Sequence, residues 1–284
     1  MKTIVQTVLA LIAFAANSVL CRLALAAETI DALSFTAIRL LSGVLVLFAI
    51  IAVSSGVKPA KARGSWTAGI MLFLYAISFS LAYINLDTGT GALILFASVQ
   101  LTIIMTTLFS GTRLKKGEWL GVLMAFTGFV FLILPGVGAP SPMGFLLMAI
   151  AGAAWGIYTL QGRGCADPLS DTAYNFIRTL PFVLILIVIA VADANLSVTG
   201  IILAMLSGGI ASGVGYSIWY AALKNLSATQ AAVVQLSVPV IAAMGGVLFV
   251  GEPLTLRLVL ATAIILSGIA IVIWSRYRIA PESE

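Results

Sequence analysis

The sequence predicts an all-α integral membrane protein, with ten transmembrane helices arranged as a 5+5 inverted repeat around a central cavity. Three observations support this prediction. The chain of 284 residues has only 15 basic and 10 acidic residues, and 61% of its residues are hydrophobic, whereas about a quarter of a soluble domain is charged. The apolar residues fall into runs long enough to cross a bilayer. Short motifs also recur at a nearly constant spacing along the chain.

The composition excludes several classes of protein. The chain has too few polar residues to cover a water-soluble particle of its size, which excludes a soluble enzyme, a nucleic-acid binder and a secreted module held by disulfides. Cys21 and Cys165 lie in or beside apolar runs and form no CxxC or metal-ligand pattern, so we interpret both as small core residues. The chain contains no histidine. We expect neither a metal nor a cofactor.

The transmembrane helices are predicted from run length. A helix needs about 20 apolar residues to cross a hydrocarbon layer of about 30 Å, and glycine, proline and charged residues divide the chain into ten such runs. A β-barrel strand would alternate apolar and polar residues, whereas residues 182–192 read FVLILIVIAVA. The runs lie near residues 3–23, 31–53, 65–86, 89–110, 117–134, 142–161, 170–192, 197–222, 227–250 and 255–275.

The first run has an alternative interpretation as a cleaved signal peptide. Lys2 precedes an apolar stretch, and Ala13-Phe14-Ala15 resembles a cleavage site. The apolar run continues to Leu20, however, and the chain that follows begins the first of two matching halves. We therefore expect the first run to be retained as a span.

The distribution of lysine and arginine predicts the orientation, because cytoplasmic loops carry an excess of basic residues. With both termini in the cytoplasm, only Arg22 and Arg257 fall outside, while Arg39 and Arg178 lie within spans. The cytoplasmic set is Lys2, Lys58, Lys61, Arg63, Arg113, Lys115, Lys116, Arg163, Lys224, Arg276 and Arg278. This bias also argues against insertion in both directions.

An internal repeat divides the chain into residues 1–140 and 141–284. Residues 31–37 (DALSFTA) match residues 167–173 (DPLSDTA) at an offset of 136. Chance similarity between apolar helices could produce one such match, but further matches follow in the same order. Five spans in each half force the halves into opposite orientations, an arrangement typical of secondary transporters. The further pairs are 79–83 with 216–220, 100–102 with 235–237, and 127–128 with 267–268.

Together with the ten predicted spans and the predicted 5+5 repeat, residues 226–255 carry a family resemblance. They read LSATQAAVVQLSVPVIAAMGGVLFVGEPLT. The chain resembles the drug/metabolite transporter superfamily in its EamA-domain branch, in particular aromatic amino-acid exporters of the YddG type. Pro239 and residues 251–255 match the family's ninth-span proline and G-E-x-L-T signature, whereas residues 111–114 (GTRL) lack the glutamate. The resemblance covers residues 3–275 and implies a multi-pass carrier of the bacterial inner membrane that exports metabolites.

Arg39 and Arg178 are the two ionisable residues predicted inside the membrane, where such residues are costly and usually functional. Each lies about eight residues into its span, or about 12 Å. One of them could bind the carboxylate of an amino-acid-like substrate. Alternatively, each snorkels or pairs with a loop acid, such as Asp167 for Arg178.

Polar and aromatic residues share helix faces in equivalent spans. Tyr75, Phe79 and Tyr83 recur every four residues in the third span, as Ser212, Tyr216 and Tyr220 do in the eighth, and this spacing places each set on one stripe. Tyr83 and Tyr220 would then lie at opposite ends of a cavity as gates, although tyrosine is also enriched at membrane interfaces. Further candidates for substrate binding are Asn17, Gln100, Gln235, Trp155 and Tyr158, whose polar groups need partners in lipid.

All ten acidic residues fall in loops or at span ends, so no carboxylate is predicted at mid-depth. An intramembrane enzyme needs a nucleophile, base or metal set there, and a channel needs a charged ring or filter, so we expect no catalytic residue. A helix tilt could bring Asp31 or Asp171 into the cavity. We expect a carrier in the lipid bilayer that exports small zwitterionic metabolites, including aromatic and hydrophobic amino acids, by alternating access. Another metabolite or drug-like solute, such as a sugar, nucleoside or cationic compound, is the alternative substrate.

Overall fold

A computed structural model describes residues 1–53, 64–109, 116–136, 138–162, 165, 167–226 and 228–277. Within these ranges the regular secondary-structure elements are all helices, and ten helices are long and apolar enough to cross a membrane. This confirms the ten spans predicted from the sequence. The helices are α1 Lys2–Ala26, α2 Ala32–Val53, α3 Trp66–Tyr83, α4 Thr88–Phe109, α5 Lys116–Ile133, α6 Pro142–Gln161, α7 Pro168–Arg178, α8 Leu180–Ala190, α9 Val198–Met205, η1 Leu206–Val214, α10 Gly215–Leu223, α11 Ala228–Gln235, α12 Val238–Gly245, η2 Gly246–Val250 and α13 Leu256–Tyr277.

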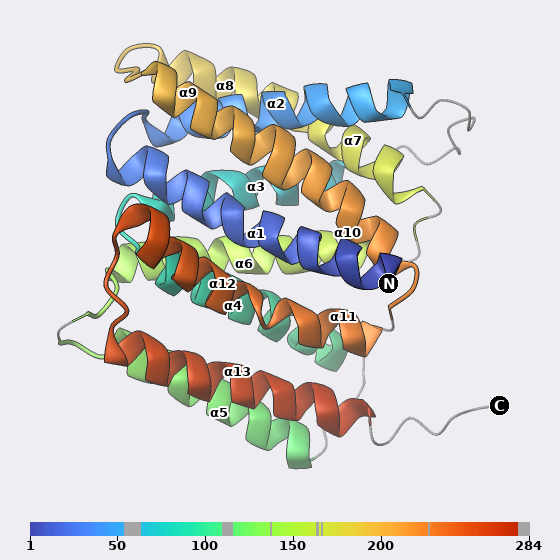
Figure 1. Cartoon of the computed structure of the whole chain (residues 1–284), viewed down its shortest axis with the longest axis vertical. Coiled ribbons are helices and arrows are strands. Elements are labelled where there is room, and N and C mark those ends of the chain that lie inside the picture. The colour runs from blue at the N-terminus through green and yellow to red at the C-terminus, as the bar shows by residue number, and fades with distance from the viewer. Residues whose placement is uncertain are drawn as a thin grey trace.

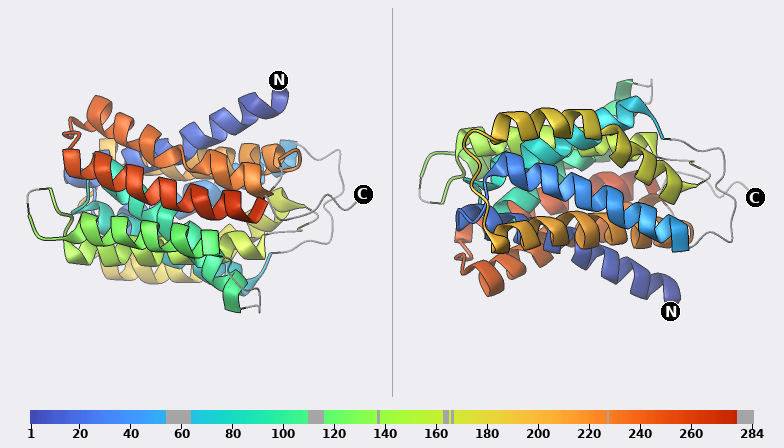
Figure 2. Two further views of the ribbon diagram at one scale, coloured as in Figure 1. Left: turned by 90° about the horizontal axis from the view of Figure 1, so that it is seen from below. Right: turned by 90° about the horizontal axis from the view of Figure 1, so that it is seen from above.

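The helices lie side by side with their axes running in one general direction (Figure 1). The start of α1 and the end of α13 lie at one end of the bundle, which we call the termini end, and we call the opposite end the far end. The α5–α13 pair covers one side of the bundle, and α2 with α8 and α9 covers the other (Figure 2). Between these sides, α1, α3, α4, α6 and α10 pack around the centre.

Three spans are interrupted, two of them at prolines. The seventh span breaks into α7 and α8 at Thr179, two residues before Pro181, and the ninth breaks into α11 and α12 before Pro239. Proline lacks an amide donor and clashes with the preceding turn, so kinks are expected at both positions. The eighth span is interrupted differently, because its centre, η1, is π-helical. Its sequence LSGGIASGV is rich in glycine, which leaves the backbone free to widen.

Glycines set the closest approaches between helices. A Cβ at Gly208 would lie 1.9 Å from the Arg39 carbonyl oxygen and 2.2 Å from Ser42 Oγ, so η1 and α2 are nearly in backbone contact. At Gly121 a Cβ would lie 2.4 Å from the Gly268 carbonyl oxygen. Small residues allow such packing in membranes, where no hydrophobic effect drives helices together.

Loops at the far end link the two predicted halves. Ile30 and Leu196 form an isolated antiparallel bridge, and Asp31 holds this region because its carboxylate accepts from the Ser34 and Asn195 amides. Asp31 therefore stays at the end of its span and does not enter the centre of the bundle. Parts of the predicted charge pattern lie outside the described residues: Lys58, Lys61, Arg63, Arg113, Lys115, Arg163, Arg278 and residues 111–114.

Candidate functional site

A small cavity of about 20 Å³ lies at the centre of the bundle. Six elements enclose it: α1, α3, α4, α6, η1 and α10. This volume holds about one water molecule, so the bundle is closed around its centre. The residues lining this central cavity are Phe14, Asn17, Tyr75, Phe79, Leu95, Phe96, Trp155, Ala211 and Tyr216.

Five of the nine predicted binding residues line this cavity: Asn17, Tyr75, Phe79, Trp155 and Tyr216. Four-residue spacing placed Tyr75 and Phe79 on one helix face, and that face points to the centre. The four other lining residues are apolar and were not predicted. Their types are common in any transmembrane helix, so no sequence signal distinguished them.

Arg39 lies beside the cavity and is only 2% exposed. Its Nη2 donates a 2.8 Å hydrogen bond to the Tyr75 hydroxyl. The guanidinium carbon lies 5.0 Å from the centre of the Tyr75 ring and 4.8 Å from that of Phe79. Within the described ranges no carboxylate forms an ion pair with Arg39, and its Nη1 has no hydrogen-bond partner. A buried cation with an unused donor favours an anion.

A polar chain connects this arginine to the eighth span. Asn17 Nδ2 donates to the Tyr75 hydroxyl at 3.1 Å, and Ser207 Oγ donates to Asn17 Oδ1 at 2.6 Å. The Tyr75 hydroxyl therefore accepts from both Arg39 and Asn17. This chain joins α1, α2, α3 and η1, so movement of one of these elements changes the surroundings of the arginine.

An aromatic column runs from the far end through the cavity. Tyr83 and Phe79 have ring centroids 4.7 Å apart, Phe79 and Tyr75 are 5.3 Å apart, and Tyr75 and Trp155 are 4.9 Å apart. Beyond Trp155 the column branches to Tyr158, whose ring is stacked at 5.1 Å, and to a tilted tyrosine of α10 at 4.9 Å. Each ring contacts the next, so the column closes the path along the bundle in this conformation.

The two gate candidates lie at opposite ends of the bundle. Tyr83 is completely buried near the far end, where its hydroxyl donates to the Thr88 carbonyl at 3.2 Å. Tyr220 lies near the termini end and lines a larger pocket. This placement agrees with the inverted positions expected for the pair, and their gating role stays a prediction.

An ion cluster closes the far end beside Tyr83. Arg22 pairs with Glu252 at 2.9 Å and lies 3.6 Å from Asp87. Its Nη1 also donates to the carbonyls of Tyr83 and Ile84 at 3.0 Å. Glu252, the glutamate of the G-E-x-L-T signature, accepts from the Thr88 amide as well. The cluster thus ties α1 and the α3–α4 loop to the η2–α13 loop.

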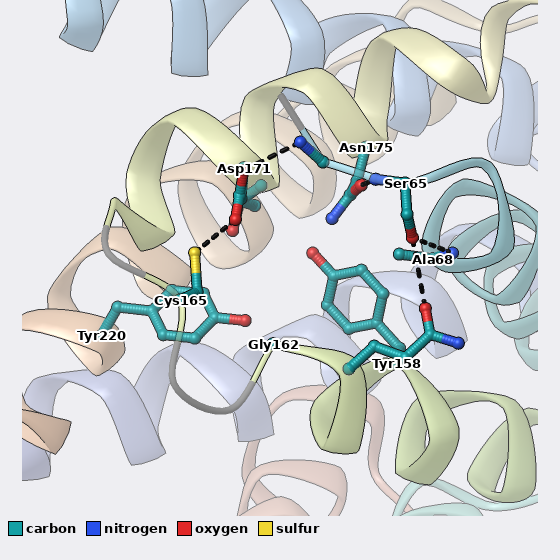
Figure 3. Close-up of a pocket in the computed structure, with 11 residues that line it drawn as sticks. Ser65, Ala68, Tyr158, Gly162, Cys165, Asp171, Asn175 and Tyr220 are labelled. Atoms are coloured by element: carbon teal, nitrogen blue, oxygen red, sulfur yellow. Dashed lines mark hydrogen bonds between the residues drawn. The ribbon is translucent and has the colours of Figure 1, made fainter. Parts of the chain in front are cut away.

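A pocket of about 270 Å³, which we call the end pocket, opens at the termini end between α3, α6, α7 and α10. In Figure 3, Tyr158 points from α6 toward Asp171 and Asn175 on α7. Asp171 accepts from the Gly64 amide at 2.8 Å and from the Cys165 thiol. The lining residues are Gly64, Ser65, Ala68, Tyr158, Gln161, Gly162, Cys165, Asp171, Thr172, Asn175 and Tyr220.

Cys165 corrects a prediction. It was expected in the core, but it lies partly exposed in the α6–α7 connection, whereas Cys21 is buried as expected. Burial, together with the hydrogen bond to Asp171, raises the pKa of the Cys165 thiol to about 11. The thiol is therefore protonated and neutral at physiological pH. The sequence pattern indicated a core position because this cysteine follows an apolar run by only a few residues.

The remaining candidates lie elsewhere. Gln100 and Gln235 are buried in α4 and at the end of α11, outside the linings of the central cavity and the end pocket. Ser212 follows a lining residue of η1, and its buried hydroxyl has no hydrogen-bond partner in the part of the chain that the structure describes. Arg178 ends α7, donates to the Tyr174 carbonyl at 2.9 Å and lies 5.9 Å from the Trp66 ring centre. Asp167, its suggested partner, instead accepts from Ser170 as the cap of α7.

The fold and its closed central cavity define a multi-pass helical membrane protein with a buried polar and aromatic centre. A family model described as the EamA-like transporter family matches residues 1–134 and 142–274. The chain belongs to the EamA-like transporter family. It is thus a multi-pass membrane transporter, embedded in a lipid bilayer and acting on a small-molecule substrate.

Several known proteins are similar to this chain. Pseudomonas aeruginosa PAO1 has a protein named uncharacterized protein PA1977 that is 50% identical over 276 residues, covering 97% of this chain and 96% of that protein. An uncharacterized transporter of Archaeoglobus fulgidus is 26% identical, with 72% and 74% covered. The uncharacterized inner membrane transporter YedA of Escherichia coli K12 is 23% identical, with 68% and 64% covered. A solved structure described as "crystal structure of protein" has the same fold, with a TM-score of 0.66, 21% identity, and 96% and 98% covered.

Proposed function

We propose that this transporter is a carrier that exports small zwitterionic metabolites, above all amino acids with aromatic or hydrophobic side chains. One observation carries the proposal: Arg39 is buried beside the central cavity with no acidic partner among the described residues and with an unused Nη1 donor. A substrate carboxylate would compensate this charge and complete its hydrogen bonds. The protein acts by binding and release, and the proposal assigns it no catalytic residue.

The lining of the central cavity supports the aromatic and hydrophobic side chains in this proposal. Phe14, Phe79, Phe96, Trp155 and Tyr216 present rings to the centre. Aromatic pairs in offset or edge-to-face geometry gain about 0.5–1.5 kcal/mol beyond their buried area. A substrate ring would replace some of the ring contacts that fill the cavity in the closed conformation.

The packing of the helices supports an inverted repeat of residues 1–140 and 141–284. The fifth and tenth spans pack together as α5 and α13, the fourth contacts the ninth as α4 and α12, and the second contacts the seventh as α2 with α7 and α8. The third span contacts the sixth, and the eighth contacts the first. Exchanging the two halves reproduces this pattern of contacts, as a pseudo-two-fold axis requires. A substrate site at the interface of such halves suits alternating access.

The proposed orientation places both termini in the cytoplasm of a bacterium, with the protein in the inner membrane. Among the described basic residues, Lys2, Lys116 and Lys224 lie at the termini end, whereas Arg22 and Arg257 lie at the far end. The excess of basic residues at the termini end supports its cytoplasmic location. Export then runs from the end pocket past Tyr220, through the central cavity, and out past Tyr83.

Alternating access requires the aromatic column to open at one end at a time. A central cavity of about 20 Å³ has no room for an amino acid, so rings must move before substrate enters. The breaks at the α7–α8 and α11–α12 junctions and the π-helical η1 are places where backbone hydrogen bonds are already rearranged. Bending at these points would move a gate without unfolding a helix.

Counterflow in proteoliposomes tests the proposal. The purified protein is reconstituted into liposomes loaded with unlabelled L-phenylalanine, and uptake of radiolabelled phenylalanine, tryptophan, methionine or threonine is followed. We expect transient accumulation above that of protein-free liposomes, with little uptake of labelled glucose or of a cationic dye. Transport of sugars or cationic dyes without any of the amino acids would show that the substrate class is wrong.

A further inference from the structure

The end pocket has a chemistry opposite to that of the central cavity. The central cavity borders the cation of Arg39, which has no acidic partner among the described residues, whereas the end pocket contains the carboxylate of Asp171. Within the described ranges, no lysine or arginine forms an ion pair with Asp171. The other acid of this region, Asp167, is turned away onto the amide and hydroxyl of Ser170.

The hydrogen bonds of Asp171 leave it with free acceptor capacity. A carboxylate offers about four acceptor positions, and here two are used, one by the Gly64 amide and one by the Cys165 thiol. The thiol is a neutral donor, because its pKa is raised to about 11. The thiol therefore brings no second charge into the pocket.

A second group in the pocket also lacks a partner. Tyr158 is 2% exposed, and its hydroxyl oxygen lies near the polar groups of Asn175, Thr172 and Tyr220 but makes no hydrogen bond of good geometry within the described part of the chain. Figure 3 shows this hydroxyl directed toward Asp171 and Asn175 across the pocket. Asn175 Oδ1 is already used by the Ser65 amide at 2.9 Å. An orphaned buried hydroxyl beside a carboxylate with free positions forms a site for a donor that carries positive charge.

We propose that the end pocket is a second binding site, which takes a primary ammonium group between the Asp171 carboxylate and the Tyr158 hydroxyl. A primary ammonium has three donors and no acceptor, which suits these two oxygens, and the ring of Tyr220 lines the same pocket. This assignment rests on the proposed function: the ammonium belongs to a zwitterionic substrate that binds here before it enters the central cavity. Tyr158 stacks on Trp155, which lines that cavity, so one aromatic pair separates the two sites.

Gly64 builds this site by its backbone. Its φ is +60°, and a Cβ there would lie 2.3 Å from Asn175 Oδ1. Only glycine adopts this conformation readily at such a close approach. The amide of Gly64 can therefore reach Asp171 and hold the carboxylate toward the pocket.

Equilibrium dialysis of the purified full chain in detergent tests the site without requiring transport. The probe is radiolabelled phenethylamine, which has an ammonium group and a ring but no carboxylate, and empty micelles supply the background. We expect saturable binding to the wild type, about tenfold or more weaker in Asp171→Asn and about two- to tenfold weaker in Tyr158→Phe. The matched control Asp167→Asn, which removes a negative charge one turn earlier at the cap of α7 and keeps a capping side chain, should bind as the wild type does.

The complementary probe is 3-phenylpropionate, which has the carboxylate and no amine. Its binding should weaken in Arg39→Gln and persist in Asp171→Asn. The end-pocket site is overturned if the wild type does not bind phenethylamine, or if Asp171→Asn binds it as tightly as Asp167→Asn does. If Asp171→Asn weakens phenethylamine binding while wild-type liposomes move no amino acid, the site stands and the proposed function fails. If the wild type transports amino acids and the two Asp variants bind phenethylamine equally, the proposed function stands and the end-pocket site fails.

Discussion

The substitution Arg39→Gln should separate the stability of this protein from its transport activity. Arg39 is 2% exposed, and no carboxylate of the described residues pairs with it. Its charge is held by one hydrogen bond to Tyr75 and by the faces of two aromatic rings. A group that is costly to bury and incompletely satisfied is expected to serve a ligand.

The structure sets the size of both effects. Removing the charge recovers a desolvation cost of several kcal/mol and forfeits a charged hydrogen bond worth about 1.5–3 kcal/mol and cation–π contacts worth about 0.5–2 kcal/mol each. These terms nearly cancel, so we expect a Tm that is unchanged or a few degrees higher. Losing the bonds to a substrate carboxylate, about 1.5–3 kcal/mol, should raise KM for L-phenylalanine by about 10- to 150-fold.

Two measurements check this prediction. Tryptophan fluorescence during heating gives the Tm of the purified variant, and counterflow at several concentrations gives KM. Arg178→Gln is the matched comparison, because Arg178 is only partly buried and bonds to a backbone carbonyl of its own helix. An unchanged KM in Arg39→Gln with a raised KM in Arg178→Gln would assign the carboxylate to Arg178. A fall in Tm of about 10 °C or more in Arg39→Gln would show that Arg39 is structural.

Four further predictions follow from the described contacts. Glu252→Gln should lower the Tm by several degrees, because it weakens the ion cluster at the far end. The control Asp193→Asn changes an exposed acid at the same end and should leave the Tm unchanged. Equal Tm values for the two variants would show that the cluster does not stabilise the fold. Gly208→Ala should reduce the yield of folded protein, because the added Cβ would overlap the backbone of α2. At Gly213 the nearest atom to an added Cβ is 3.4 Å away, so Gly213→Ala should fold. Similar yields of the two variants would contradict the close packing of η1 and α2. Alkylation of Cys165 by a maleimide should be slow at pH 7 and rise about tenfold per pH unit until near its pKa of about 11, and a rate that levels off near pH 8 would refute that pKa. Counterflow should vary little between pH 6 and 8, because no histidine is present and carboxyl groups ordinarily titrate lower; a steep change would point to a coupled acid.

The predictions that succeeded from sequence rest on local physical chemistry. The ten spans follow from run length, because each helix must satisfy its own backbone in lipid. The breaks near Pro181 and Pro239 follow from the missing amide of proline. Four-residue spacing likewise placed Tyr75 and Phe79 on the helix face that points to the centre. Each of these properties depends on one segment alone, so the order of residues is sufficient.

Tertiary structure decided the properties that depend on two or more segments. Arg39 and Arg178 look alike in sequence, but the approach of η1 at Gly208 helps to bury Arg39 among other helices, while Arg178 ends a short helix and bonds to it. Asp171 was recognised only as a span-end acid, and the end pocket depends on Gly64, more than a hundred residues earlier, reaching it with an amide. The sequence determines which side chains are charged, but packing between distant segments determines whether each charge has a compensating partner. The electrostatic character of the two sites is therefore a property of the folded bundle.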